Sequence, residues 1–194
     1  MTHNDIPGFF DWREFYKAAF IQVCESFPEP QTIQIVELGT FFGKSSCFMG
    51  EIIKESHRDV HFETCDLFDT RFANDESISN FVKFNLQNND GNSWRGLVGR
   101  YLHDAGVLPH VLLTTADSVH LATSYADESV HLVYIDACHE YDSVYADISA
   151  WLPKVKTGGI ISGHDYDRKS VQRAVAELIG PVSVTCERTW FKVK

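Results

Sequence analysis

The chain lacks the features that would tie it to nucleic acid or to a membrane. Its 17 Lys and Arg residues are outnumbered by 27 Asp and Glu residues, which gives a formal net charge of −10. Proteins that bind nucleic acid normally carry a basic patch, so we expect no nucleic-acid partner. No apolar run reaches the roughly 18 residues of a transmembrane helix, and residues 1–11 do not read as a signal peptide. We therefore expect a cytoplasmic protein that spans no membrane.

Cysteine pairs, linkers and repeats are also missing. The five cysteines are odd in number, widely spaced and without a Cys-x-x-Cys pair, which argues against a disulfide framework and against a zinc cluster. No Pro-, Gly- or Ser-rich linker, internal repeat or low-complexity tract divides the chain. A length of 194 residues with 44% hydrophobic content is sufficient for one packed core. We expect a single domain over residues 1–194.

What the chain does contain is a regular alternation of strand-like and helix-like segments. Five segments read as strands, and they span residues 33–38, 60–66, 111–115, 130–135 and 159–162. Apolar residues at helical spacing predict helices at residues 12–27, 44–56, 141–151 and 170–178. Two last runs, at residues 182–186 and 189–193, read as a closing hairpin. The alternation predicts an α/β fold with a mainly parallel sheet and right-handed crossovers.

Two segments fall outside this alternation. Residues 1–30 contain the first of these helices and end at a Pro-Glu-Pro break, so we expect a helical cap that lies over the sheet. Residues 70–109 are less regular, with predicted helices at 78–86 and 94–104 on either side of a polar loop at 87–92. We expect this variable helical insert to determine which substrate the protein accepts.

The first strand ends in a glycine turn that suits ligand binding. The turn reads Glu37-Leu38-Gly39-Thr40-Phe41-Phe42-Gly43-Lys44-Ser45. Glycines let backbone amides approach a ligand closely, and amides at the start of the following helix can bind a carboxylate together with the Ser45 hydroxyl. Alternatively, the glycines serve only the tight turn from strand to helix.

The fourth and fifth strands end in carboxylates and imidazoles. The fourth strand runs into Asp136 and His139, and the fifth runs into His164 and Asp165. Open α/β sheets bind their ligands at the carboxyl ends of parallel strands. We therefore expect a cofactor cleft at this edge of the sheet.

An ordered series of residues surrounds these side chains. It comprises Ile135-Asp136-Ala137-Cys138-His139-Glu140-Tyr141, Val144, Asp147, Trp151-Leu152-Pro153, Gly158-Gly159 and Gly163-His164-Asp165-Tyr166. The series resembles the class I S-adenosylmethionine-dependent methyltransferases, and within them the small-molecule O-methyltransferases related to the catechol and macrolide-sugar enzymes. The match covers nearly the whole chain outside residues 1–30 and 70–109. It departs from the pattern at Ala137-Cys138, where Gly and a polar residue are usual.

The resemblance has consequences for fold and function. It implies a Rossmann-like class I methyltransferase fold, with a seven-stranded, mainly parallel sheet, a C-terminal antiparallel hairpin and helices on both faces. It also implies S-adenosylmethionine as the cofactor and a hydroxyl of a small molecule as the methyl acceptor, with in-line displacement at the methyl carbon.

The resemblance assigns the cofactor to residues along the carboxyl edge of the sheet. They are Glu37, Gly39, Thr40, Gly43, Ser45, Asp66, Asp117, Ser118 and Asp136. The glycine turn would hold the methionyl end, Asp66 the ribose hydroxyls, and Asp117 with Ser118 the adenine. Alternatively, Asp66 is only a solvated carboxylate in a loop, and Glu63 or Asp69 contacts the ribose in its place. For Asp117 the alternative is a helix N-cap.

The resemblance also implies a divalent cation. Metal-dependent members bind it with an acidic residue after strand four and two neighbouring residues after strand five, which correspond to Asp136, His164 and Asp165. A cation lowers the pKa of a bound hydroxyl and fixes its oxygen in line with the methyl group. Oxygen ligands favour Mg²⁺ or Ca²⁺, whereas an imidazole favours Mn²⁺ or another transition metal, so the identity of the metal stays open.

His139 is a further candidate for the chemistry. An imidazole titrates near neutral pH, so His139 is a predicted general base, and the predicted catalytic residues are Asp136, His139 and His164. The alternative is a histidine that is merely hydrogen-bonded in the turn before a helix.

Two other functions are compatible with the sequence at this point. One is a catalytically silent protein that only binds S-adenosylmethionine. The other is a different Rossmann-like enzyme such as an oxidoreductase, which is disfavoured because Gly39 and Gly43 do not form the Gly-x-Gly-x-x-Gly fingerprint. A homodimer in which the N-terminal helix completes the active site is also compatible with the sequence.

Overall fold

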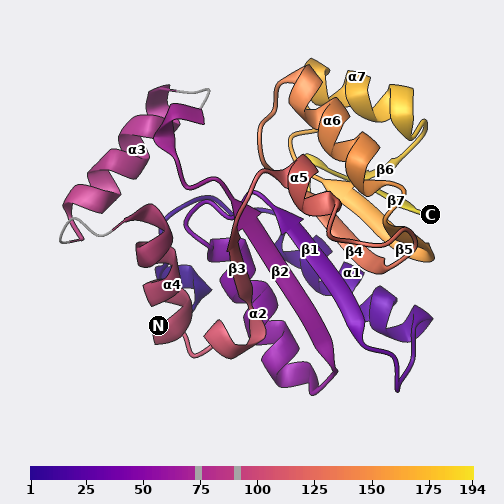
Figure 1. Cartoon of the computed structure of the whole chain (residues 1–194), viewed down its shortest axis with the longest axis horizontal. Coiled ribbons are helices and arrows are strands. Elements are labelled where there is room, and N and C mark those ends of the chain that lie inside the picture. Colours follow the sequence, from indigo (N-terminus) through magenta and orange to yellow (C-terminus); the bar gives the residue numbers. More distant parts are fainter. Residues whose placement is uncertain (73–75, 90–92) are drawn as a thin grey trace.

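A computed structural model of the chain describes residues 1–72, 76–89 and 93–194. These residues form a seven-stranded sheet in the order β3-β2-β1-β4-β5-β7-β6 (Figure 1). The strands are β1 (Ile33–Leu38), β2 (Val60–Asp66), β3 (Leu112–Thr115), β4 (Val130–Ile135), β5 (Val155–Gly163), β6 (Ser183–Thr185) and β7 (Thr189–Val193). Strands β1 to β5 pair in parallel with one another, and β7 is antiparallel to both β5 and β6. The predicted mainly parallel sheet with a C-terminal hairpin is confirmed.

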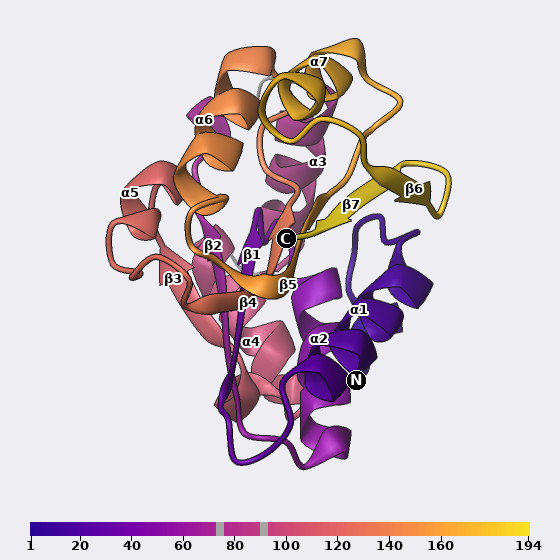
Figure 2. The same ribbon diagram turned by 90° about the vertical axis from the view of Figure 1, so that its right-hand side faces the viewer.

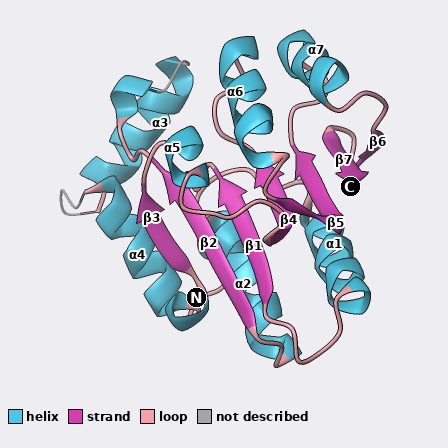
Figure 3. Cartoon of the chain, turned by 45° about the vertical axis from the view of Figure 1, so that its right-hand side comes forward, coloured by secondary structure: helices cyan, strands magenta, loops and turns pink. Residues whose placement is uncertain are grey.

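Helices cover both faces of the sheet, as Figure 3 shows. They are α1 (Arg13–Ser26), α2 (Lys44–Ser56), α3 (Glu76–Gln87), α4 (Trp94–Asp104), α5 (Ser118–Ala122), α6 (Tyr141–Trp151) and α7 (Lys169–Leu178), with short 3₁₀ helices η1 (His3–Asp5), η2 (Thr70–Phe72) and η3 (Leu108–His110). Buried residues of α1, α2 and α4 pack on one face, and those of α5, α6 and α7 pack on the other. No helix in the described part of the chain combines the length and apolarity needed to cross a bilayer.

The alternation of side chains along β1 explains the two cores. Ile33 and Ile35 belong to the core under α1 and α2, whereas Val36 and Leu38 belong to the core under α6 and α7. Successive side chains of a strand point to opposite faces, so a strand covered on both sides is apolar at nearly every position. This is why the apolar residues of β1 do not alternate strictly with polar ones but occur on both faces of the strand.

The predicted N-terminal helix lies over the sheet, where Figure 2 shows α1 beside the ends of β4 and β5. Trp12 stacks on Tyr134 of β4 with ring centroids 5.5 Å apart, and Tyr16 meets the same ring edge-on at 4.8 Å. Tyr134 is fully buried. These aromatic contacts fix the start of α1 close to the carboxyl end of β4.

The largest difference from the predicted boundaries is the start of β5. The strand was expected at residues 159–162 but begins at Val155, because Val155 pairs with Val130 before a bulge interrupts the register. Gly158 has φ 85° within this irregular stretch. The residues at the start of β5 are mostly polar and do not have the pattern of a strand, so the strand was predicted too short. Of the polar loop expected at 87–92, residues 90–92 lie outside the described residues.

Hydrogen bonds tie the exits of neighbouring strands together. The Gly39 amide donates to the carbonyl of Cys65 (2.9 Å) and the Asp136 amide donates to the carbonyl of Leu38 (2.8 Å). The amide of His164 donates to the carbonyl of Ile135 (3.1 Å). The loops that follow β1, β4 and β5 therefore lie side by side at one edge of the sheet.

Candidate active site

The glycine turn after β1 is packed against the end of β4. Gly39 has φ 95°, and a β-carbon added there would lie 2.0 Å from the carbonyl oxygen of Asp136. Gly43 has φ 79° and is the N-cap of α2. Both positions have left-handed backbone conformations that favour glycine. The turn itself thus requires the two glycines, as the alternative reading held, and their contact with a cofactor stays a prediction.

Glu37 connects four elements from a buried position behind this turn. Its carboxylate accepts hydrogen bonds from the hydroxyls of Tyr16 (2.9 Å), Ser46 and Thr64 (2.8 Å). Burial raises the pKa of Glu37, and the hydroxyl hydrogen bonds oppose the rise. Thr40, also buried, hydrogen-bonds through its hydroxyl to Thr64 (2.7 Å). Both predicted cofactor residues thus hold α1, α2, β1 and β2 together.

Asp66 ends β2 and organises two loops. Its carboxylate accepts the backbone N–H of Phe41 and the backbone N–H of Phe68, each at 2.9 Å. Burial raises the pKa of Asp66, while these backbone hydrogen bonds oppose the rise. The competitors are engaged elsewhere, because Asp69 pairs with Arg71 and Glu63 accepts hydrogen bonds from Thr114 and Tyr125. Asp66 is therefore no freely solvated loop carboxylate, and its contact with a ribose stays a prediction.

Asp117 and Ser118 stand at the start of α5. The Asp117 side chain accepts the N–H of His120 at 2.9 Å, so it is the N-cap of the helix. The Ser118 hydroxyl donates a hydrogen bond to Asp147 on α6. Burial raises the pKa of Asp147 to about 6, and the hydrogen bond from Ser118 opposes this rise. The N-cap reading is confirmed for Asp117. Recognition of adenine by these two residues stays a prediction.

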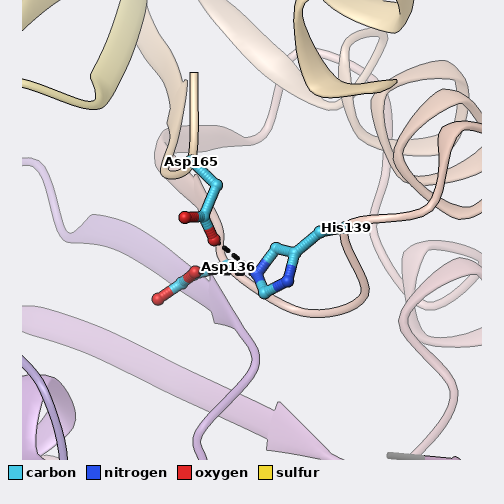
Figure 4. Close-up of side chains that lie close together, drawn as sticks. All are labelled: Asp136, His139 and Asp165. Carbon is cyan, nitrogen blue, oxygen red and sulfur yellow. Dashed lines mark ion pairs between the residues drawn. The ribbon is translucent and has the colours of Figure 1, made fainter. Parts of the chain in front are cut away.

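Three side chains converge at the carboxyl ends of β4 and β5. Ligand atoms of Asp136, His139 and Asp165 all lie within 4.8 Å of one another (Figure 4). The Nε2 atom of His139 is 2.7 Å from Asp165 Oδ2 and 3.6 Å from Asp136 Oδ1. This Nε2 is buried and has no well-aligned hydrogen-bond acceptor among the described residues. We call these three residues the Asp-His-Asp cluster.

The electrostatics of this cluster follow from its geometry. Burial disfavours a charged His139, but the nearby carboxylates of Asp136 and Asp165 raise its pKa to about 10. Burial likewise opposes ionisation of Asp165, yet hydrogen bonds and charge from His139 and His164 hold the pKa of that carboxyl well below its usual range. Asp165 has φ 54°, a left-handed conformation that Asp tolerates better than most residues. The Asp165 carboxylate therefore lies between the imidazoles of His139 and His164.

His164 lies beside the cluster with its two nitrogens facing opposite partners. Its Nε2 is 2.9 Å from Asp11 Oδ1, whereas its Nδ1 is 3.8 Å from Asp136 Oδ1 and 3.7 Å from Asp165 Oδ2. The predicted ligand set named His164, and the closest group of possible ligand atoms contains His139 in its place. The sequence did single out His139, but as a general base. Asp11 carried no signal in the sequence, because it contacts a residue 153 positions away.

Comparison with known proteins identifies the family. The family model for a methyltransferase domain matches residues 36–166, which include the glycine turn and the whole Asp-His-Asp cluster. The chain therefore belongs to the methyltransferase-domain family, and its sheet has the strand order of the class I S-adenosylmethionine-dependent methyltransferases. This match decides against an oxidoreductase. Among curated proteins there is no match.

Several solved structures share the fold. The O-methyltransferase NovP has a TM-score of 0.71 and 16% identity, covering 95% of this chain and 79% of NovP. CalS11, a TDP-rhamnose 3'-O-methyltransferase, has a TM-score of 0.58 and 16% identity, with 92% and 76% coverage. A caffeoyl-CoA O-methyltransferase assigned in Staphylococcus aureus has a TM-score of 0.61 and 15% identity, with 98% and 87% coverage. At these identities the likeness concerns the fold.

Proposed function

We propose that this methyltransferase transfers the methyl group of S-adenosylmethionine to a hydroxyl oxygen of a small molecule, with the help of a divalent cation. The observation that carries the proposal is the Asp-His-Asp cluster at the carboxyl ends of β4 and β5. Open α/β sheets bind their ligands at this edge. The names of NovP and CalS11 describe O-methyltransferases, which supports oxygen as the accepting atom.

The side chains of the cluster suit a divalent cation. The two carboxylates are hard ligands and the imidazole is a borderline one, and Mg²⁺ and Mn²⁺ accept ligands of these kinds. The Nε2 atom of His139 is buried between these carboxylates, 2.7 Å from Asp165 Oδ2, and a bound cation would take the place of the proton that the carboxylates favour there. Asp136, His139 and Asp165 would hold the cation, with His164 as the predicted ligand beside them. A bound cation would lower the pKa of the acceptor hydroxyl.

The residues along the same edge suit the cofactor. The start of α2 can bind a carboxylate, the Asp66 carboxylate can accept hydrogen bonds from a diol, and Asp136 can pair with an ammonium group. These are the polar groups of S-adenosylmethionine, whose sulfonium supplies an electrophilic methyl group. Gly39 lies against Asp136, so one rigid contact joins the cofactor side of the site to the cluster.

The protein's own contribution is mainly orientation. When a protein holds two reacting groups in a productive geometry, the activation barrier can fall by on the order of 7–11 kcal/mol, because their translational and rotational entropy is already lost on binding. Asp136 and Asp165 hold the acceptor side, and with His139 on the cation, His164 is the neighbouring imidazole that can take a proton from the acceptor hydroxyl. The net charge of −10 disfavours polyanionic acceptors, so a small neutral or weakly charged molecule fits best.

Isothermal titration tests the proposal directly. S-adenosylmethionine and S-adenosylhomocysteine are titrated into metal-stripped protein, alone and with Mg²⁺ or Mn²⁺. We expect both nucleosides to bind, and we expect Asp165→Asn to weaken the metal isotherm by at least about 10-fold, because it removes one of the ligands. Asp142→Asn is the matched control, since Asp142 is an exposed carboxylate in the first turn of α6.

An acceptor panel then separates an enzyme from a silent binding protein. Sugar hydroxyls and phenolic hydroxyls are offered together with radiolabelled cofactor, and transfer of the label is measured. Label transfer that is lost in Asp165→Asn supports the proposal. Folded protein that binds both nucleosides but transfers no label to any acceptor would favour the silent alternative, and folded protein without nucleoside binding would refute the cofactor assignment.

A further inference from the structure

The segment before α1 forms a strap across the carboxyl edge of the sheet. We define the N-terminal strap as residues 3–12. At its start His3 Nδ1 lies 2.6 Å from Glu51 Oε2 on α2. In its middle, the Gly8 carbonyl accepts a hydrogen bond from Lys44 Nζ (3.4 Å), and a β-carbon on Gly8 would lie 3.3 Å from the Phe41 ring. The strap therefore passes from α2 over the glycine turn.

At its end the strap reaches the Asp-His-Asp cluster through Asp11. One Asp11 oxygen, Oδ1, is 2.9 Å from His164 Nε2, and Arg188 Nη2 donates to the other, Oδ2, at 2.8 Å. Arg188 lies 177 positions from Asp11, between β6 and β7. Both partners also approach Asp165, His164 with Nδ1 at 3.7 Å and Arg188 with Nη1 at 3.4 Å. Two separate routes thus connect Asp11 to the same ligand carboxylate.

The strap holds the His164 ring on two sides. The Trp12 ring lies 4.3 Å from the imidazole, and Trp12 is only 5% exposed, so this wall is fixed by packing. Because Nε2 faces Asp11, Nδ1 faces Asp136 and Asp165. A carboxylate behind an imidazole fixes the tautomer and the orientation of the ring, which is how supporting carboxylates act behind ligand histidines.

We propose that Asp11 is a positioning residue, which fixes Asp165 and the His164 ring at the cation cluster through Arg188 and His164. The inference rests on the proposed function, since it assumes that the cluster binds a cation. Asp11 makes its contacts from outside the segment matched by the family model. It need not touch cofactor or acceptor to act.

Binding of Mn²⁺, followed by electron paramagnetic resonance of the free ion, tests the inference without any turnover. We expect Asp11→Asn to weaken Mn²⁺ binding by about 10-fold or more, the size typical of supporting carboxylates. Asp5→Asn is the control, because Asp5 lies in the same strap but its carboxylate binds the backbone of Thr2. We expect Asp5→Asn to bind Mn²⁺ as the wild type does.

A second variant separates position from charge. Asp11→Asn also removes a negative charge, which by itself weakens cation binding. Arg188→Gln removes a positive charge, which by itself would strengthen it, so weaker binding in this variant reports lost positioning. We expect Arg188→Gln to bind Mn²⁺ about 5-fold or more weakly than the wild type. The same variant decides the matter if Asp11→Asn fails to fold.

The outcomes are distinct. If the wild type binds Mn²⁺ and folded Asp11→Asn binds it equally well, the positioning role is overturned and the proposed function is left intact. The same holds if Arg188→Gln binds Mn²⁺ more tightly than the wild type. A wild-type protein that binds no Mn²⁺ overturns the cation site and the inference together.

Discussion

Replacing Gly39 with alanine tests how tightly the end of β1 is packed against the end of β4. The added β-carbon would lie 2.0 Å from the Asp136 carbonyl oxygen, whereas contacts under 3.0 Å are essentially never found, so the two segments must separate by about 1 Å. The residue would also keep φ 95° with a side chain, which costs roughly 1–2 kcal/mol. Overpacking adds roughly 1–3 kcal/mol. We expect Gly39→Ala to lower the free energy of unfolding by about 2–5 kcal/mol.

The same displacement moves Asp136 away from its working position. A misplacement of about 1 Å can cost on the order of 100-fold in rate, and we expect binding of S-adenosylhomocysteine to fall as well. Urea denaturation followed by circular dichroism measures the stability, and isothermal titration measures the binding. Gly180→Ala is the matched control, because Gly180 has φ 77° with no atom within 4 Å of an added β-carbon. That control should lose only about 1–2 kcal/mol and bind normally.

If Gly39→Ala is as stable as Gly180→Ala and binds the nucleoside as tightly as the wild type, the close approach between the two strand ends does not control the site. The conformational cost is common to both variants, so only the contact with Asp136 distinguishes them.

Two further predictions concern buried polar groups. Glu37→Leu leaves three hydroxyl donors without their buried acceptor, so we expect a loss of roughly 2–4 kcal/mol in urea denaturation, and a variant as stable as the wild type would contradict it. Burial and the charge of Lys156 lower the pKa of His131 to about 4, below the unfolded value near 6.5. At this residue the unfolded chain therefore binds more protons between these values, so His131 by itself should remove about 2 kcal/mol of stability from pH 7 to pH 5. His131→Asn should lack this contribution, and an unchanged pH dependence would argue against it.

The fold was predictable because its signals are local. A central parallel strand is covered on both faces, so it carries apolar residues on both of them, and β1, β2 and β4 were predicted with their observed bounds. β5 was predicted too short because its first residues owe their pairing to a bulge opposite Val130. That pairing depends on the neighbouring strand, and no property of the segment itself reports it.

The carboxylates of the candidate site were predictable for a topological reason. Asp136 follows β4 directly and Asp165 follows β5 after one residue, and parallel neighbours bring such positions to one edge of the sheet. The choice of imidazole was harder. His139 and His164 both place a nitrogen near the two carboxylates, and which ring comes closer depends on the loop after each strand and on the left-handed backbone of Asp165.

Asp11 marks the limit of sequence-based reasoning about such a site. Its partners lie 153 and 177 positions along the chain, and no periodicity or motif links residues at those separations. The three segments meet because the Trp12 and Tyr134 rings stack at the start of α1 and because β7 pairs antiparallel with β5, which brings Arg188 beside the exit of β5. Ligand carboxylates at strand ends are thus specified by sheet topology, whereas the groups that hold them in position are specified by how the two termini pack on that sheet. Substitutions of Asp11 or Trp12 should therefore change the geometry of the cluster even though both residues lie outside the matched family domain.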